Sequence, residues 1–169
     1  KPAKIIRSSE YIKEVDIQNA ISMIREAKRP YILVGGGAVI SDAADELKEF
    51  AEKVDAPVCD TLMGKGAFNG TDERYSGMLG MHGTKASNLG VSHCDLLIAV
   101  GTRFSDRVLG NPKTFAKNAK ILQIDVDPVE INKNICVSAS IIGDVKAVLT
   151  VINRRLEAQE HKEWLDTVK

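Results

Sequence analysis

Residues 30–41 combine a short apolar run with a glycine triplet, and this pairing restricts the fold of the chain. Tyr31 to Val34 are predicted to form a buried strand, Gly35 to Gly37 a tight turn, and a helix is expected from Ser41 or Asp42. A buried parallel strand places such a turn at the carboxyl edge of a sheet, where glycines let the backbone approach a ligand. The following helix offers free N–H groups to an anion. The stretch therefore predicts a strand-turn-helix unit that binds phosphate.

The glycine spacing matches only part of the dinucleotide-binding fingerprint. That fingerprint places glycine at its first, third and sixth positions. Gly35 and Gly37 satisfy the first two, but the sixth position is Ile40. The spacing favours a variant nucleotide loop over an ordinary nicotinamide site. The alternative is a glycine turn between strand and helix that binds nothing.

Strand and helix patterns alternate along most of the chain. This alternation predicts an α/β fold: a doubly wound, mostly parallel sheet of about six strands flanked by helices, Rossmann-like. The expected strands are residues 31–34, 57–61, 75–80, 96–100, 121–126 and 137–142. Ligands of such sheets bind beyond the carboxyl ends of the strands. We therefore expect convergence of the loops at residues 35–37, 61–64, 80–83, 101–107, 125–126 and 143–144.

Composition excludes several classes of function. The 169 residues carry 23 Lys plus Arg and 23 Asp plus Glu, so no basic field exists to attract nucleic acid or an anionic membrane. No apolar run reaches membrane-spanning length and residues 1–4 lack the hydrophobic core of a signal peptide, so a cytoplasmic location is expected. Three cysteines, far apart, argue against a disulfide framework or a zinc site and are expected to behave as small apolar residues.

The expected organisation is an incoming linker over residues 1–10, a central nucleotide-binding domain over 11–156 and an outgoing helix or linker over 157–169. The first helix is predicted from Tyr11 to Lys28. Because the chain does not begin with methionine, we expect it to be a piece of a longer protein.

Charged residues at the predicted strand ends are candidate ligand contacts. Arg103 and Arg107 follow the strand at 96–100, and two guanidinium groups there suit a pyrophosphate, since each can donate a bidentate pair of hydrogen bonds. The alternative is that one of these arginines forms a surface ion pair with Asp106 or a neighbouring acidic residue. Asp125 ends another strand, where a carboxylate can accept hydrogen bonds from ribose hydroxyls, and Asp60 is a weaker candidate for that role.

Asp144 opens a helix after Gly143, so either helix capping or ligand contact explains it. His82 lies in a glycine-bearing loop and could stack on or hydrogen-bond to a ring system, whereas His161 is expected in solvent. The sequence contains no nucleophile-base pair, metal-ligand cluster or carboxylate pair with catalytic spacing. It therefore indicates a binding domain rather than a complete active site.

The motifs, taken in order, resemble the central domain of the thiamine-diphosphate enzymes, and among these the acetolactate synthase large (catalytic) subunits. The segments that carry this resemblance are Arg29-Pro30, Gly35–Gly37, Thr61–Gly66, Gly80–Gly83, Gly101–Val108 and Ile124–Pro128. Together they span nearly the whole chain in the order found in that family.

The resemblance implies a transferase that decarboxylates pyruvate and joins it to a second 2-oxo acid, the first shared step of branched-chain amino acid biosynthesis. It implies a flavoprotein whose middle domain holds FAD structurally, without turnover, while thiamine diphosphate (thiamine pyrophosphate) and magnesium belong to other domains. On this resemblance the FAD site would be lined by Gly35, Gly36, Gly37, Thr61, Leu62, Met63, Gly80, Met81, His82, Gly101, Arg103, Arg107, Asp125, Val126, Asp144 and Val145. It implies no catalytic and no metal-ligating residue in this chain.

The chain departs from the family pattern in two respects. Ser105 stands where the family often has aspartate, and the Gly-Asp-Gly segment that binds magnesium and diphosphate is absent. By the resemblance, the chain is a middle domain that is inactive alone, with the flanking thiamine-binding domains of the same chain and a regulatory small subunit as expected partners and a homo-oligomeric parent enzyme. The alternatives are a scaffold domain of another thiamine-diphosphate enzyme without flavin, and an NAD-binding oxidoreductase domain.

Overall fold

The computed structural model describes residues 12–169, so the predicted linker over 1–10 and the first-helix start at Tyr11 lie outside the described residues. A six-stranded sheet, parallel throughout, has the order β3-β2-β1-β4-β5-β6. The strands are β1 (Pro30–Val34), β2 (Val58–Asp60), β3 (Tyr75–Met78), β4 (Leu96–Val100), β5 (Lys120–Asp125) and β6 (Ala139–Ile142). This order is that of doubly wound nucleotide-binding sheets. The predicted fold class is confirmed.

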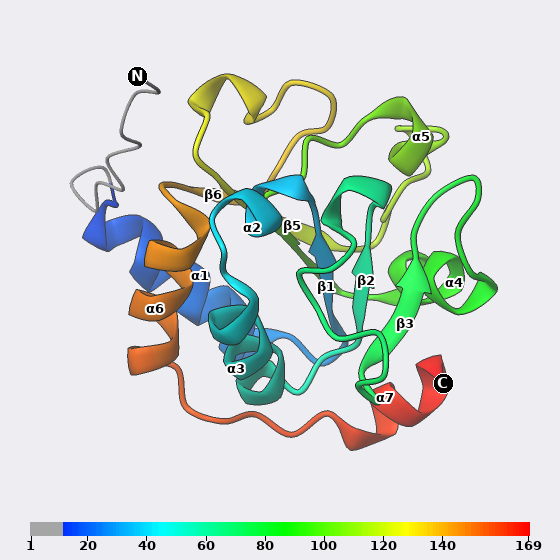
Figure 1. Ribbon diagram of the computed structural model, residues 1–169, viewed down its shortest axis with the longest axis horizontal. Helices are drawn as coiled ribbons and strands as arrows, with labels where there is room; N and C mark the ends of the chain where they lie inside the picture. Colours follow the sequence, from blue (N-terminus) through cyan, green and yellow to red (C-terminus); the bar gives the residue numbers. More distant parts are fainter. Residues whose placement is uncertain (1–11) are drawn as a thin grey trace.

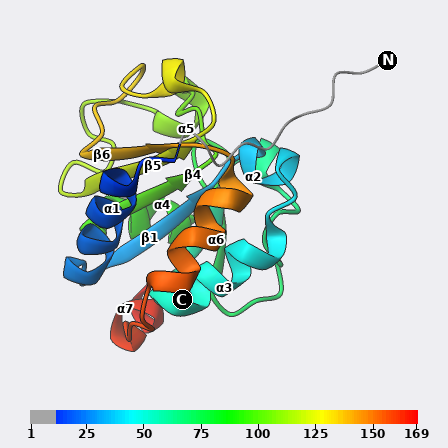
Figure 2. The same ribbon diagram turned by 90° about the vertical axis from the view of Figure 1, so that its left-hand side faces the viewer.

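Helices cover both faces of the sheet (Figures 1 and 2). The helical elements are α1 (Glu14–Glu26), α2 (Gly36–Ile40), α3 (Ala44–Val54), η2 (Leu62–Gly64), α4 (Lys85–His93), α5 (Asp106–Leu109), η3 (Pro128–Glu130), α6 (Val145–Arg155) and α7 (Lys162–Val168). Helices α1, α3 and α6 pack on one face, and α4 and α7 lie on the other. Ile32 of β1 belongs to the first core and its neighbour Leu33 to the second, so a central strand is apolar at every position.

The helix expected after the glycine triplet begins earlier than predicted. Helix α2 starts at Gly36, inside the triplet, and ends at Ile40. Asp42 then adopts a left-handed backbone with φ 55°, which interrupts the helix. Helix α3 follows with Ala43 as its N-cap residue and no side-chain capping bond. The predicted cap at Ser41 or Asp42 is therefore wrong.

The segment after α6 runs to the opposite face of the sheet, where α7 lies near α4 and β3 (Figure 1). Trp164 donates its indole N–H to the Pro30 carbonyl oxygen at 2.8 Å and meets the Tyr31 ring edge-on. His161 is half-buried, and its ring nitrogens lie 2.8 and 3.0 Å from the carbonyl oxygens of Val54 and Ala27. The expectation that His161 lies in solvent is wrong, because this segment covers the sheet.

Two further observations bear on the composition argument. Cys59 and Cys94 are buried, as expected of small apolar residues, but Cys136 is exposed in the loop before β6. Across residues 12–169, no helix has the combined length and apolar character that crossing a lipid bilayer requires.

Candidate cofactor-binding site

The loops after β1 and β4 meet at the point where the strand order reverses. From β1 the chain continues to β2 on one side, whereas from β4 it continues to β5 on the other. The Gly35 N–H donates to the Val100 carbonyl oxygen at 2.9 Å, and the Gly37 N–H donates to the Gly101 carbonyl oxygen at 3.0 Å. Ligands of open α/β sheets bind at such a switch point. This carboxyl edge lies at the top of Figure 1.

The glycines allow the two loops to touch. A Cβ added at Gly35 would lie 2.2 Å from the Gly101 carbonyl oxygen, and one at Gly37 would lie 2.8 Å from the Gly101 Cα. Gly101 itself has φ +64°, a conformation that favours glycine. A Cβ at Gly36 would lie 3.1 Å from the Cβ of Met63. The triplet is thus explained first by close packing of main chain against main chain.

Arg103 and Arg107 are exposed and follow β4 at the switch point. The arginine ion pairs among residues 12–169 use Arg74 and Arg155, so the alternative of a surface pair with Asp106 is not what the structure shows. Two cationic groups therefore stand free at the edge where an anionic ligand would bind.

The segment between β4 and Arg103 contains an unsatisfied polar group. Thr102 is 2 % exposed, and its hydroxyl oxygen has no hydrogen-bond partner in the described chain. That oxygen lies 2.6 Å from where a Cβ at Gly35 would be. Buried hydroxyl groups normally have a partner, so this one marks a place where a protein or ligand atom is expected.

Asp125 ends β5 and is buried, with one carboxylate oxygen accepting the Asp127 backbone N–H at 2.9 Å. Burial raises the pKa of Asp125, and this rise is opposed by the Asp127 hydrogen bond and, more weakly, by the nearby charge of Arg103. Arg103 and Asp125 therefore come from neighbouring strands to one region. Val126, the next residue, is largely exposed.

The β6 loop lies beside Asp125, since the Gly143 N–H donates to the Asp125 carbonyl oxygen at 2.9 Å. Asp144 caps α6 by accepting the Ala147 N–H at 3.1 Å. The capping interpretation is therefore present in the structure. Val145 is buried, so its main chain rather than its side chain is available at this edge.

The loop after β2 supplies apolar groups. Thr61 caps the short helix η2 by accepting the Gly64 N–H at 3.2 Å, and its own N–H donates to the Val34 carbonyl oxygen at 2.9 Å. Leu62 and Met63 are 68 % and 75 % exposed. The cap therefore places two apolar side chains in solvent next to the glycine triplet.

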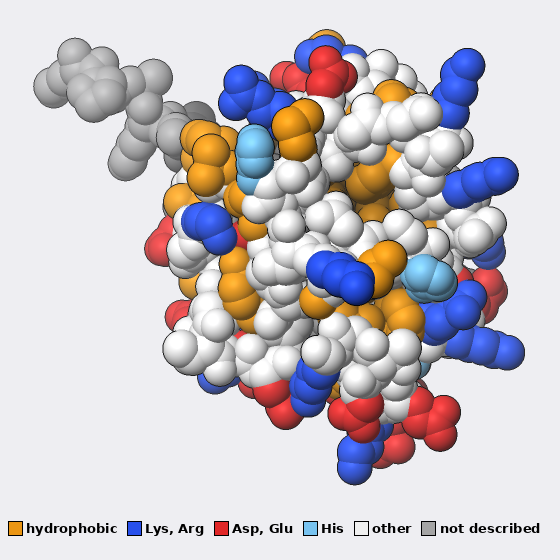
Figure 3. All heavy atoms as spheres, turned by 90° about the vertical axis from the view of Figure 1, so that its right-hand side faces the viewer, with side chains coloured by type: hydrophobic (Ala, Val, Ile, Leu, Met, Phe, Trp, Pro, Cys, Tyr) orange, Lys and Arg blue, Asp and Glu red, His pale blue; other side chains and the backbone are white. Residues whose placement is uncertain are grey.

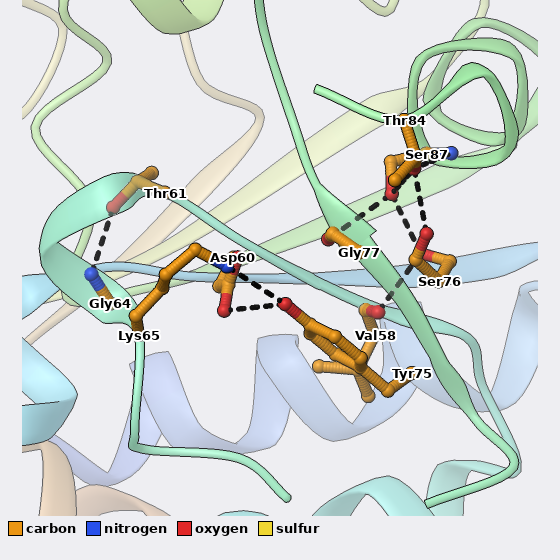
Figure 4. Close-up of polar contacts among 10 residues, drawn as sticks. All are labelled: Val58, Asp60, Thr61, Gly64, Lys65, Tyr75, Ser76, Gly77, Thr84 and Ser87. Atoms are coloured by element: carbon orange, nitrogen blue, oxygen red, sulfur yellow. Dashed lines mark hydrogen bonds and ion pairs between the residues drawn. The ribbon is translucent and has the colours of Figure 1, made fainter. Parts of the chain in front are cut away.

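Asp60 is closed off from a ligand (Figure 4). Its side chain is 4 % exposed. One carboxylate oxygen accepts the Tyr75 hydroxyl hydrogen at 2.9 Å, and the other lies 3.4 Å from the Lys65 ammonium nitrogen. The Lys65 ammonium also donates to the Tyr75 hydroxyl oxygen at 3.2 Å. Both carboxylate oxygens of Asp60 are therefore occupied by protein groups, and the expected role of Asp60 as an acceptor for ribose hydroxyls is not supported.

The loop after β3 reaches across to the loop after β4, although these strands are not neighbours in the sheet. The Met81 N–H donates to the Arg107 carbonyl oxygen at 3.2 Å, and a Cβ at Gly80 would lie 2.4 Å from that oxygen. The side-chain amide of Asn88 on α4 binds the Gly80 main chain, accepting its N–H at 3.2 Å and donating to its carbonyl oxygen at 3.1 Å. His82 is exposed at the loop tip. The loops after β1, β2, β3 and β4 thus meet at one edge.

Most large apolar side chains that the fold leaves exposed belong to this carboxyl edge. They are Val39, Ile40, Leu62, Met63, Met81, Val126 and Val129. On the face shown in Figure 3, hydrophobic side chains surface at the upper left, toward the same edge. Within residues 12–169 no three His, Cys, Asp or Glu side chains are grouped so as to hold a metal ion. Grooves of about 420 and 230 Å³ lie elsewhere, beside α1 and beside α7.

Three side chains that support these loops were not predicted from the sequence. They are Asn88, Gln123 and Asn134, whose amides bond to backbone atoms of the loops after β3 and β4. Gln123 carried a signal, because it is the one polar residue within the apolar run 121–124. The two asparagines carried none, since asparagine is ordinary in loops and on helix surfaces.

Comparison with known proteins gives a match over most of the chain. Residues 17–152 match the model of the thiamine pyrophosphate enzyme, central domain. A probable acetolactate synthase large subunit of Methanocaldococcus jannaschii is 50% identical over 157 residues, covering 91% of this chain and 27% of that protein. The acetolactate synthase large subunits of Cyanidium caldarium and Corynebacterium glutamicum are 51% and 44% identical, each over 90% of this chain and 27% and 25% of their own length. The chain spans about a quarter of the length of these curated relatives.

Proposed function

The chain belongs to the thiamine pyrophosphate enzymes, as their central domain, and from this premise we propose that it is the FAD-holding middle part of an acetolactate synthase large subunit. The observation that carries the proposal is that Arg103 and Arg107 lie directly after β4 at the switch point and form no ion pair with any residue of 12–169. Their guanidinium groups suit the two phosphates of a dinucleotide.

The residues at this edge fit FAD in three respects. Among residues 12–169, Arg103 and Arg107 have no ion-pair partner and can contact the pyrophosphate, and the buried Thr102 hydroxyl has no hydrogen-bond partner. Exposed apolar side chains such as Met63 and Met81 provide surface for a large aromatic ring. FAD supplies a redox-capable isoalloxazine ring, which in the proposed role serves structure rather than turnover.

Each of the remaining site residues has a proposed part. Asp125 and Asp144 accept hydrogen bonds from the ribose or adenine of the nucleotide, with Val126 and Val145 beside them. Thr61 and Leu62 border the ring with Met63, and Gly80 and His82 border it with Met81. Gly36 and Gly37 contribute main chain.

An NAD-binding oxidoreductase is less well supported. In dinucleotide folds an acidic residue near the end of the second strand accepts hydrogen bonds from the ribose hydroxyls. Asp60 has that position, but Tyr75 and Lys65 already occupy both of its carboxylate oxygens. The competing candidate is a scaffold domain without flavin. Such a domain does not require free arginines or exposed apolar side chains at this edge, but their presence is compatible with it.

For the whole enzyme we propose pyruvate decarboxylation followed by carboligation to 2-acetolactate, with thiamine diphosphate and magnesium held by domains outside this chain. The isolated chain is then inactive. The proposed partners are those flanking domains, a regulatory small subunit and further copies of the parent enzyme, in the cytoplasm.

Titration of the purified chain with FAD, following flavin fluorescence, tests the proposal. We expect saturable quenching of flavin fluorescence by the chain, and no change in the fluorescence of NADH, the fluorescent reduced form of NAD, when the chain is added to it. Arg103→Ala should weaken FAD binding, whereas Arg25→Ala on α1, which removes an exposed arginine far from the edge, should leave it unchanged. Binding of NAD with no binding of FAD would favour the oxidoreductase, and binding of neither would favour the scaffold. Unchanged affinity in Arg103→Ala would overturn the role of Arg103 in binding the pyrophosphate.

A further inference from the structure

Each of the four residues after β4, residues 101–104, has a carbonyl oxygen that accepts a hydrogen bond from another part of the chain. The Gly101 oxygen accepts the Gly37 N–H at 3.0 Å. The Thr102 oxygen accepts the Gln123 side-chain amide at 3.2 Å. The oxygens of Arg103 and Phe104 both accept the Asn134 side-chain amide, at 3.3 and 3.1 Å. Each of these donors lies outside the segment 101–104.

The conformation held in this way is one that the segment would not favour by itself. Phe104 has φ 49°, in the left-handed region that non-glycine residues adopt rarely. Its ring is buried and meets Phe115 edge-on. Such a backbone persists where its surroundings determine it. Here the surroundings are the packing of the buried Phe104 ring and the hydrogen bonds from the side-chain amides of Gln123 and Asn134.

Gln123 is unusual as a structural residue. It is fully buried in the middle of β5, and while its amide nitrogen donates to Thr102, its amide oxygen has no partner in the described chain. A buried amide with one unmade hydrogen bond contributes less to stability than an apolar side chain of the same size would. Its one specific contact is with the backbone of the residue that precedes Arg103.

Asn134 binds the same segment, at the residues that follow Thr102. It lies in the loop between η3 and β6, and its amide nitrogen bridges two successive carbonyl oxygens. Because Arg103 is exposed and forms no ion pair within residues 12–169, its side chain is not fixed by a partner. The backbone on either side of it is fixed instead, by Gln123 before it and Asn134 after it.

We propose that Gln123 and Asn134 are positioning residues, which hold segment 101–104 so that Arg103 is presented to the pyrophosphate of a bound nucleotide. The inference rests on the proposed FAD site and adds to it the two side chains that prepare the segment before the ligand arrives. Holding a binding group in place beforehand lowers the conformational entropy lost on binding. The amides therefore act on affinity through Arg103 without touching the ligand.

The test compares Asn134→Ala and Gln123→Met with a matched control, Asn111→Ala. Asn111 also lies in a loop after β4, but its side chain accepts only the Lys113 N–H, away from segment 101–104. Two quantities are measured for each variant: hydrogen exchange of a peptide covering residues 101–107 in the chain without ligand, and the dissociation constant for FAD. Thermal unfolding midpoints show whether each variant is folded.

We expect faster exchange over residues 101–107 and about fivefold to tenfold weaker FAD binding in Asn134→Ala, with neither change in Asn111→Ala. In an Arg103→Ala background, Asn134→Ala should cause no further loss, because the two residues act on one contact. A residue that served stability alone would lower the unfolding midpoint and weaken FAD binding equally with or without Arg103.

The outcomes separate the two proposals. If the unaltered chain binds no FAD, the proposed function fails and the positioning role fails with it. If the unaltered chain binds FAD and Asn134→Ala binds it equally well, only the positioning inference is overturned. Gln123→Met tests the same inference at a buried position. If that variant does not fold, the FAD affinity of Asn134→Ala, a variant at an exposed position, still tests the inference.

Discussion

Replacement of Gly35 by alanine tests the central claim that the loops after β1 and β4 pack main chain against main chain. The Gly35 backbone, φ −112° and ψ −176°, is one that alanine adopts without strain, so any cost is steric. The new Cβ would lie 2.2 Å from the Gly101 carbonyl oxygen, 2.6 Å from the Thr102 hydroxyl oxygen and 2.7 Å from the Thr102 Cα, where ordinary contact begins at 3.4 Å. Two of these three atoms are backbone and cannot rotate away.

The magnitude follows from what must move. Overpacking a tight contact costs about 1–3 kcal/mol. Separating the loops also weakens the hydrogen bonds from Gly35 and Gly37 to the β4 end, each worth about 0.5–1.5 kcal/mol. Alanine regains about 0.4–1 kcal/mol by restricting the unfolded chain. We expect a net loss of about 2–4 kcal/mol, which for a domain of this size lowers the unfolding midpoint by about 5–15 °C.

The assay is thermal and urea unfolding followed by the fluorescence of Trp164, the single tryptophan of the chain. Gly70→Ala is the matched control, because its backbone is not left-handed and the nearest atom to a new Cβ is 3.7 Å away. It should leave the midpoint unchanged or raise it slightly. A Gly35→Ala midpoint equal to that of Gly70→Ala would refute the claim that the loops are in contact.

Three further outcomes are expected. Tyr75→Phe should lower the unfolding free energy by about 1–3 kcal/mol in urea titrations, because the buried Asp60 carboxylate loses a hydrogen bond; an unchanged urea midpoint would contradict this. One thiol, that of Cys136, should react with a disulfide reagent at pH 8 in the folded chain, since burial raises the pKa of Cys94 to about 12 and that of Cys59 well above its usual range; Cys136→Ser should abolish the reaction, and release of two equivalents would count against it. Because burial raises the pKa of Asp125, its ionised form opposes folding once the pH exceeds that raised pKa, and the effect vanishes below about pH 4, where the carboxyl is protonated in both states. Asp125→Asn should therefore raise the unfolding midpoint at pH 7 but not at pH 3.5, and a gain of equal size at both values would argue against the assigned cause.

The sheet was predictable because its strands are signalled by apolar runs. Residues 96–100 are apolar throughout since both faces of β4 are covered, and that property is visible in the sequence. The weak stretch at 75–80 became β3, confirming that prediction, although only residues 75–78 are strand. The start of α2 inside the glycine triplet was not predictable, because it depends on loop contact across the sheet rather than on local propensity.

For the candidate site, the sequence predicted which loops converge but not how each side chain is used. The Asp60 carboxylate contacts Tyr75 and Lys65. The contact with Tyr75 depends on the register in which β2 and β3 pair. The role of Asn134 depends on a loop remote in sequence from Arg103. These side-chain contacts depend on tertiary structure, so they cannot be predicted from sequence periodicity or motif spacing.

The contact of Gly35 and Gly37 with Gly101 also limits how a chain of this kind can diverge. At the switch point the position of the main chain is fixed by contacts between the two loops and does not depend on which side chains surround it. For the proposed FAD site, we therefore expect mutations that alter ligand preference without unfolding the chain at exposed side chains such as Leu62, Met81 and Ser105. Under this proposal, substitutions at those positions change which ligand is bound, whereas substitutions at Gly35, Gly37 or Gly101 change whether the domain folds.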